Sequence, residues 1–263
     1  FNSLQVKAEK RMSHGMWMLV SYTWSKFISS GIDQQFGAGY DQYSGLISPY
    51  QRQRNKSLDS QDVPHTVSWT TVYELPMGKG HRFLGTQNAF ASRIFSGWQI
   101  NTVFRAQSGT PYIFRSGQCN IPSQFGMACI PSILNGANVF NTDPGSYDPG
   151  SGPLFNRDAF QNGSNGGVFS FDPGAGSRTS GVRQAPFEKL DFVLEKNTKI
   201  TEGIKLQIRA EFFNVFNWHF FSQGTTWGQG QAFITDVGSP LFGQWTGAVT
   251  TPRNIQLAAR LAF

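Results

Sequence analysis

The chain has 263 residues, of which 39% are hydrophobic, 14% aromatic and only 14% charged. The charged share lies well below the ~25% of a typical soluble domain, and together with 29 Gly it favours an all-β protein whose surface meets something other than water. The formal net charge is +6, but the basic residues are scattered, which excludes a nucleic-acid-binding tract.

No segment has the composition of a signal peptide or of a spanning helix. Phe1 to Arg11 alternates apolar and charged residues, so it lacks the apolar core of a signal peptide. No stretch approaches the ~18 to 20 continuous apolar residues of a transmembrane helix. A helical membrane protein is therefore excluded, whereas a β-barrel membrane protein is not, because its strands are short and alternating. We expect the chain to begin inside a strand of a larger protein or to have been trimmed at its start.

Seven segments alternate between apolar and polar residues with a period of two, as strands with two different faces do. The predicted strands are Leu4 to Lys10, Met16 to Ser25, Thr66 to Leu75, Trp98 to Gln107, Leu190 to Glu195, Ile204 to Phe213 and Asn254 to Phe263. The first two are joined by a predicted tight turn at Ser13-His14-Gly15.

The predicted connections alternate in length. Residues 13–15 and 200–203 are short turns, and residues 76–97 form a link of medium length. Residues 26–65, 108–187 and 214–252 are long. This order is typical of an outer-membrane barrel, with short turns on one side of the membrane and long loops on the other. A compact soluble domain does not need loops of such length.

The two faces of the predicted strands differ in kind. One face is almost free of charge and carries Leu, Ile, Val, Ala and aromatic residues. The other carries Lys7, Glu9, Glu74, Arg105, Asp191, Glu195, Lys205, Arg209, Glu211 and Arg260. In a water-soluble sandwich the apolar face is buried between two sheets. In an outer-membrane barrel it faces lipid and the charged face lines the lumen, so the alternation fits both architectures.

Three further features favour the barrel. The strands run about ten residues, enough to cross a bilayer at a tilt. The chain ends on Phe263, an aromatic residue suited to the edge of a lipid-facing band. Aromatic residues also gather near both ends of the strands, in two belts like those at membrane interfaces. These residues are Tyr73, Trp98 and Phe263 beside the short links, and Tyr22, Trp24 and Phe212 beside the long loops.

Several stretches of the chain carry a family resemblance. They are Asp62-Val63-Pro64-His65, Gly97-Trp98-Gln99-Ile100, residues 3–11, 21–26, 73–80, 107–112 and 209–217, and the terminal Phe263. In these stretches the chain resembles the C-terminal part of a TonB-dependent outer-membrane receptor, of the subgroup with a carboxypeptidase-regulatory-like front domain (the Oar-like receptors). The matches follow one another along the whole chain.

The resemblance implies an all-β fold, an antiparallel transmembrane β-barrel segment of about seven meander strands that is part of a 22-stranded barrel. Residues 1–263 would be the C-terminal part of a single barrel domain, without the plug and the front strands. The implied localisation is the cell outer membrane of a Gram-negative bacterium. The implied partners are outer-membrane lipid, the barrel-assembly machinery through Phe263 as a C-terminal signal, the TonB energy-transducing complex through the missing plug, and an unknown scarce ligand; no nucleic acid is expected.

Candidate site residues fall into three groups. Cys119 and Cys129, the only cysteines, lie in the longest predicted outer loop and form a disulfide candidate; a metal pair would need further ligands that are not evident. Trp218, His219 and Trp227 are possible ligand-contacting loop residues, in loops rich in aromatic residues, Gly and Asn. The lumen-facing charges Arg105, Asp191, Glu195, Lys205, Arg209, Glu211 and Arg260 are expected to pair across the wall and to meet a plug, with direct substrate binding as the alternative.

Catalytic and cofactor signals are lacking. The repeated Asp-Pro-Gly-Ser at Asp143 and Asp148 is typical of turns and lacks the spacing of a calcium loop. No nucleophile elbow and no phosphate-binding loop is present. We expect no enzyme activity and no cofactor. Two alternatives remain open: a secreted or surface β-sandwich adhesin or binding module, and an outer-membrane barrel enzyme with its catalytic group at the lumen rim.

Overall fold

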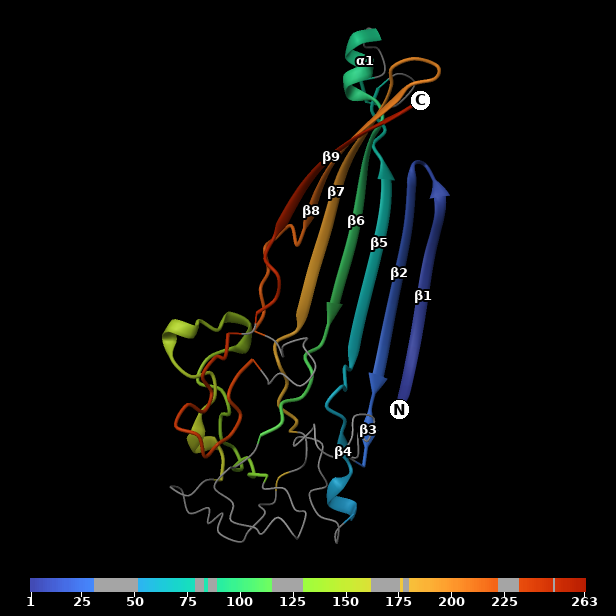
Figure 1. Cartoon of the computed structure of the whole chain (residues 1–263). Coiled ribbons are helices and arrows are strands. Elements are labelled where there is room, and N and C mark those ends of the chain that lie inside the picture. The colour runs from blue at the N-terminus through green and yellow to red at the C-terminus, as the bar shows by residue number, and fades with distance from the viewer. Residues whose placement is uncertain are drawn as a thin grey trace.

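The computed structural model describes residues 1–30, 52–78, 83–84, 89–114, 130–161, 176, 180–221, 232–247 and 249–263. Its main feature is one antiparallel sheet of seven strands in the order β1-β2-β5-β6-β7-β8-β9 (Figure 1). Each inner strand of this sheet therefore pairs with the sheet strand that comes before it and the sheet strand that comes after it in chain order. The strands are β1 Asn2–Ser13, β2 Met16–Lys26, β5 His65–Glu74, β6 Trp98–Gln107, β7 Phe187–Lys199, β8 Lys205–Phe213 and β9 Asn254–Ala262. The predicted seven-stranded meander is confirmed.

The largest difference in strand bounds is at β7. The alternating pattern predicts six residues, Leu190 to Glu195, whereas the strand runs over 13 residues, Phe187–Lys199. Its two ends carry Glu188, Lys189, Lys196 and Asn197, so both faces are polar there and the alternation disappears. The strand continues because its backbone pairs with β6 and β8, which the residue pattern does not reveal.

The remaining elements are short and lie in the connections. A two-stranded ladder of β3 Ile28–Ser29 and β4 Ser57–Leu58 lies within the predicted loop 26–65. Helix α1, Ala89–Phe95, lies within the link 76–97 and was not predicted. The 3-10 turns are Arg52–Asn55, Pro144–Ser146, Pro149–Ser151 and Arg157–Ala159.

Short links and long loops lie at opposite ends of the sheet. Figure 1 shows the β1–β2 turn, α1 and the C-terminus at one end, and the long connections at the other. The β1–β2 turn is tight because His14 and Gly15 both adopt positive φ, 51° and 74°, as two-residue hairpins of the favoured twist require. The predicted two-sided arrangement of connections is therefore confirmed.

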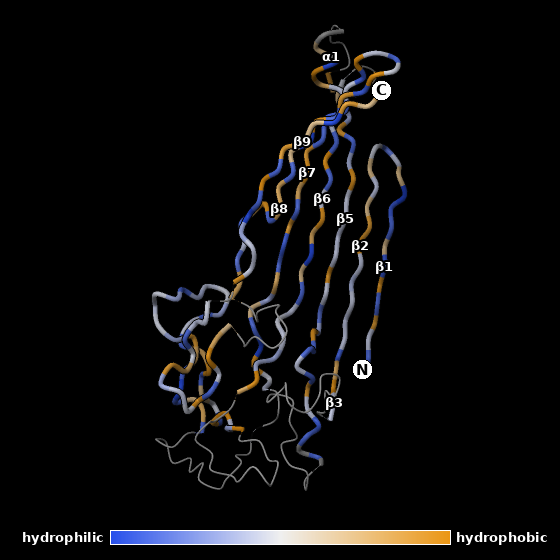
Figure 2. The backbone as a smooth tube through the Cα atoms, in the orientation of Figure 1, coloured by the Kyte–Doolittle hydropathy of each residue, from blue (hydrophilic) through white to orange (hydrophobic). Residues whose placement is uncertain are grey.

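The register separates an apolar from a polar face. One row of paired residues crosses six strands on the apolar face, and Figure 2 shows the alternation along each strand. The row consists of Met16, Tyr73, Ile100, Leu194, Ala210 and Leu257. Within the described residues no second sheet covers this face, and Leu257 is 81% exposed while Trp69 and Trp24 are about 40% exposed. The sheet is not closed: β1 and β9 each pair with one described strand.

Lys196 is a cation on the apolar face, paired in register with Trp98. Its Nζ donates a hydrogen bond to the carbonyl of Arg93 at 2.9 Å and another to the carbonyl of Ser96. It also lies 5.7 Å from the centre of the Trp98 ring. The carbonyls at the C-terminal end of a helix are favourable partners for a cation. The end of α1 therefore binds the ammonium group of Lys196, which extends away from the apolar face of the strand.

The one buried aromatic cluster of the described chain lies outside the sheet. It is formed by the long connections β6–β7 and β8–β9, whose residues 112–114, 130–161 and 232–247 we call the outer-loop subdomain. Figure 1 shows the segments 130–161 and 232–247 side by side beyond the end of the sheet. The buried hydrophobic residues are Tyr112, Phe114, Val139, Tyr147, Leu154, Phe155, Ala159, Phe160, Ala232, Phe233, Val237 and Phe242.

Candidate functional site

The seven charged residues predicted to face a lumen share one face of the sheet. In the register Glu195 lies opposite Arg209, while Arg105 lies opposite Lys189. The face shared by these charges contains Arg105, Asp191, Glu195, Lys205, Arg209, Glu211 and Arg260. Because strand side chains alternate, all seven lie on the side of the sheet opposite the apolar row.

Glu195 is the centre of a polar network on this face. Its Oε1 accepts hydrogen bonds from Asn197 Nδ2 at 2.6 Å and from Gln207 Nε2 at 2.8 Å, and its Oε2 lies 3.8 Å from Arg209 Nε. The Arg209 guanidinium also pairs with Glu211. The carboxylate side chains are only 12% and 15% exposed, so this network is sheltered more than ordinary surface ion pairs.

A second group lies nearer the long loops. Lys189 Nζ is 3.1 Å from Asp191 Oδ2, and Asp191 Oδ1 accepts a hydrogen bond from the backbone N–H of Asn214 at 2.9 Å. Arg105, Lys205 and Arg260 form no ion pair with any residue that the structure describes. The polar face thus combines paired charges on β7 and β8 with cations that are open to a further partner.

Asn214 organises the turn that leaves β8. It is buried and adopts φ 55°, a left-handed conformation that Asn tolerates better than most residues. Its Nδ2 donates to the carbonyls of Trp218 at 2.7 Å and Thr251 at 3.2 Å, and its Oδ1 accepts from the Trp218 N–H at 3.0 Å. One side chain therefore ties the start of the β8–β9 connection to its end.

The predicted ligand-contacting residues have different surroundings. Trp218 is half-buried and its ring lies 4.8 Å from that of the exposed Phe216. His219 is exposed, with its ring edge-on to Phe221 at 5.8 Å. Trp227, like Cys119 and Cys129, lies outside the described residues, so the disulfide remains a prediction. Among the described residues, no group of three or more His, Cys, Asp or Glu side chains lies close enough to hold a metal ion.

The outer-loop subdomain has a core built from both long connections. The ring of Phe155 lies edge-on to Tyr112 at 4.9 Å and to Phe114 at 5.1 Å, and it lies 5.7 Å from Phe233. The Leu154 N–H donates to the Gly243 carbonyl at 2.8 Å, so backbone bonds also join the two connections. Edge-to-face aromatic pairs of this kind stabilise a core beyond the area that they bury.

Sequence reasoning predicted these loops as ligand-contacting segments but did not predict that they fold together. The signal was the density of Phe and Tyr between residues 112 and 160 and again between 216 and 245. Burial raises the pKa of Tyr112 far above its usual range, because the phenolate is poorly solvated in this core.

Two consecutive turns repeat the same side-chain geometry. Asp143 Oδ1 accepts from the Gly145 N–H at 3.0 Å, and Asp148 Oδ1 accepts from the Gly150 N–H at 2.9 Å. Each Asp therefore caps a short 3-10 turn that begins with Pro. The interpretation of this repeat as turn chemistry is confirmed.

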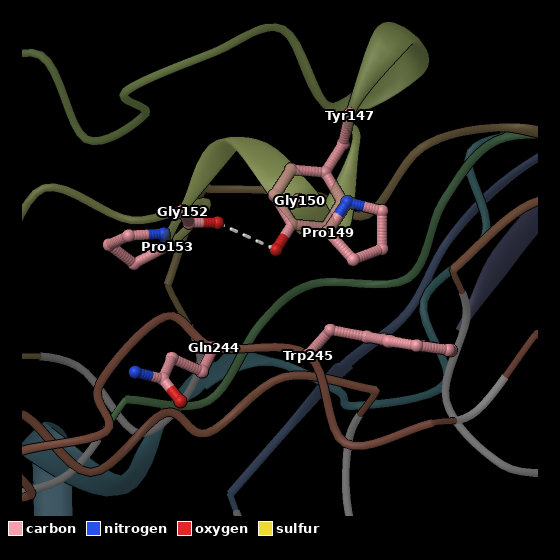
Figure 3. Close-up of a pocket in the computed structure, with 7 residues that line it drawn as sticks. All are labelled: Tyr147, Pro149, Gly150, Gly152, Pro153, Gln244 and Trp245. Atoms are coloured by element: carbon pink, nitrogen blue, oxygen red, sulfur yellow. Dashed lines mark hydrogen bonds between the residues drawn. The ribbon is translucent and has the colours of Figure 1, made fainter.

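The second of these turns forms one wall of a pocket of about 310 Å³. The pocket is lined by Tyr147, Pro149, Gly150, Gly152 and Pro153 on one side and by Gln244 and Trp245 on the other (Figure 3). It opens on the subdomain surface and lies next to the aromatic core, since Tyr147 belongs to both. A volume of this size is at the lower end of small-molecule sites.

Comparison with known families agrees with the geometry. A family model described as "Outer membrane beta barrel domain" matches residues 1–256. Searches of curated proteins and of solved structures gave no match. No helix among the described residues is long and apolar enough to span a membrane.

Proposed function

The chain belongs to the outer membrane beta barrel domain family, and from this premise we propose that it forms the C-terminal barrel wall and outer loops of a TonB-dependent receptor that takes up a scarce ligand. Family membership places it in the outer membrane of a Gram-negative bacterium. The apolar face then meets lipid, and the face with the Glu195 network lines the lumen. Residues 1–263 belong, in this proposal, to one 22-stranded barrel domain that is closed by further strands.

The observation that carries the proposal is the outer-loop subdomain. A pore needs only a wall and a constriction, whereas here two long connections on one side of the membrane share an aromatic core. A folded structure of this kind at the barrel mouth can hold a ligand in a fixed geometry before transport, because its contact residues are preorganised. Cations on the polar face without a described ion pair, among them Arg105, Lys205 and Arg260, supply charge for a plug domain to pair with.

The sandwich alternative has no structural support among the described residues. It requires a second sheet over the apolar face, and the main sheet has none. A barrel enzyme would need a catalytic group near the rim, and we propose neither a catalytic role nor a cofactor. The proposed partners are outer-membrane lipid, the barrel-assembly machinery acting on Phe263, the TonB energy-transducing complex acting through a plug, and a ligand still to be identified.

A pair of neighbouring residues on β5 tests the proposal. A photo-crosslinking amino acid is placed at Ser68, on the polar face, or at Val67, on the apolar face, of the full-length protein in cells. The expected result is an internal crosslink from position 68 to a plug segment and a lipid adduct from position 67. The full-length protein should also co-purify with the periplasmic domain of TonB. A water-exposed position 68 without a crosslink, together with no capture by TonB, would favour a plain pore and overturn the proposal.

A further inference from the structure

The pocket in the outer-loop subdomain has the shape of a slot between an aromatic plate and a turn. Figure 3 shows the indole of Trp245 nearly edge-on, below the rings of Tyr147 and Pro149, with Gln244 beside it below Gly152 and Pro153. A flat ligand that enters the slot therefore meets the indole with one face and the turn with the other.

The position of Trp245 is fixed by its neighbours. Its ring packs edge-on against Phe221 at 5.5 Å, with 76° between the ring planes, and its backbone pairs with that of Phe233. Trp245 is nevertheless 37% exposed as a residue, so it is accessible to solvent on the pocket side. An indole that is held at its edge and open on its surface is a platform for an apolar ligand face, with little rotamer entropy to lose on binding.

The polar groups around the slot are neutral. The Tyr147 hydroxyl donates to the Gly152 carbonyl at 2.8 Å, which leaves its oxygen able to accept. Burial and the neighbouring Asp148 carboxylate raise the pKa of Tyr147, so this group stays a hydroxyl at neutral pH. The Gln244 side chain is exposed and makes no hydrogen bond with the residues that the structure describes, so both its amide donors and its acceptor are available.

We propose that this pocket is a subsite for a neutral saccharide, with a pyranose ring stacked on Trp245 and its hydroxyls bonded to Gln244 and to the turn. A sugar ring has one apolar C–H face and a rim of hydroxyls that donate and accept, which is the complement of an indole plate bordered by a carboxamide and turn carbonyls. The proposal deepens the proposed function by naming a ligand class for the outer loops, but the binding itself does not depend on transport.

Other ligand classes fit the lining less well. An anion or a cation would lack an opposite charge, because no Lys, Arg, Asp or Glu is among the described residues that line the pocket. The carboxylate of Asp148, which precedes Pro149 in the chain, already accepts the Gly150 N–H that caps its turn. A purely apolar ligand would leave the Gln244 amide and the turn carbonyls without partners, which disfavours binding.

The test is binding of three defined oligosaccharides to the purified full-length protein by calorimetry: maltohexaose, cellohexaose and chitohexaose. At least one is expected to bind, and Trp245→Ala should weaken that affinity at least about tenfold, the scale of one lost stacking contact. Gln244→Ala should weaken it a few-fold, as expected for one hydrogen bond. The matched control is Trp24→Ala, which removes a similarly exposed indole from the apolar face of the sheet, outside the pocket, and should leave the affinity unchanged.

The Gln244 variant also guards against misfolding, because its exposed side chain does not pack in the core, whereas Trp245 contacts Phe221. The proposal is overturned if none of the three sugars binds, or if the bound sugar is indifferent to both Trp245→Ala and Gln244→Ala. Uptake of the same sugar by cells with and without TonB is a separate readout. Binding without TonB-dependent uptake would keep the saccharide subsite and remove the transport role.

Discussion

Arg183 reaches across 121 residues of sequence to the buried carboxylate of Asp62, and this pair joins two of the long connections just beyond the sheet. Arg183 Nη1 also donates to the carbonyls of Asp62 at 2.9 Å and Gly109 at 3.1 Å. Asp62 Oδ1 accepts the Phe27 N–H at 2.5 Å, so the residue that follows β2 is held as well. With Asp62 only 1% exposed, the carboxylate depends on these partners.

Removal of the guanidinium should therefore destabilise the loop end of the protein strongly. We expect Arg183→Met to lower the free energy of unfolding by roughly 3 to 5 kcal/mol, because it leaves a buried carboxylate without its cation. Urea titration of the full-length protein in lipid vesicles measures the change. Adding Asp62→Asn should recover part of the loss. Lys7→Met, which disrupts the exposed Lys7–Glu9 pair at 3.8 Å, is the control and should change stability by about 1 kcal/mol or less.

A loss no larger than that of the control would contradict the assignment of Asp62 and Arg183 as a buried pair. In the sequence, the Asp62-Val63-Pro64-His65 stretch indicates only a family resemblance. The structure supplies a physical reason for its acidic residue, since Asp62 accepts from Phe27 and Arg183 while the Pro64 carbonyl accepts from Ser25 at 2.9 Å.

Most of the sheet could be predicted from the sequence because the two faces of each strand meet different environments. The alternation records that difference residue by residue, so the faces of Trp98 and Gln99, or of Leu257 and Gln256, were assigned correctly. The β1–β2 turn was also readable, because Gly15 follows His14 at a position that needs positive φ. The ends of β7 were missed because polar residues occupy both faces there.

The outer-loop subdomain could not be predicted in the same way. Its core joins Phe155 to Phe233 and Tyr112 to Phe160 through neighbours far apart in the chain, and these rings follow no fixed period. Local patterns identified only its turns, at Asp143 and Asp148. The pocket beside Trp245 arises from the packing of two connections, so the sequence of neither connection alone predicts it.

The assignment of faces can be tested on β6 with two adjacent residues, of which the more polar one lies on the apolar face. Thr102 lies on the apolar face, between Thr71 and Phe192, whereas the more apolar Val103 lies on the polar face, between Thr70 and Asp191. We expect Thr102→Arg to destabilise the protein in lipid by about 2 to 4 kcal/mol, and Val103→Arg to have a much smaller effect near Asp191. Vesicle-based unfolding of both variants measures the difference; a larger loss at position 103 would invert the orientation of the sheet.

Gly97 offers a test of how closely β6 and β7 approach. It has φ 76°, and a Cβ there would clash with the carbonyl oxygen of Asn197. The N–H of Asn197 also donates to the Gly97 carbonyl at 2.8 Å. Gly97→Ala should disturb this end of the sheet by more than the ~1 to 2 kcal/mol of left-handed strain alone. The fraction of protein that migrates as folded barrel without heating is a suitable measurement.

Gly136 is the matched control, since it has the same φ of 76° but no described atom within 4 Å of an added Cβ. Gly136→Ala should show the backbone strain only, and in the outer-loop subdomain rather than in the sheet. Equal effects of the two substitutions would mean that the contact with Asn197 is unimportant.

The buried Tyr112 predicts a loss of stability at high pH. Its pKa in the folded subdomain lies above the ordinary value of about 10, so the unfolded chain releases the proton first. The contribution of Tyr112 to the free energy of unfolding is therefore fully present below about pH 10. It declines as the pH rises further, by at most about 1.4 kcal/mol per pH unit. Near-UV circular dichroism during urea titration at about pH 8 and pH 11 follows the packing of the aromatic core.

Tyr112→Phe should flatten this decline, because the ring remains and the ionisable hydroxyl is gone. Phe155→Leu is the control: it lowers stability through poorer packing of the neighbouring ring, 4.9 Å away, and should do so equally at both pH values. A decline above pH 10 that survives Tyr112→Phe unchanged would assign the alkaline sensitivity to another group and would leave Tyr112 without a role in it.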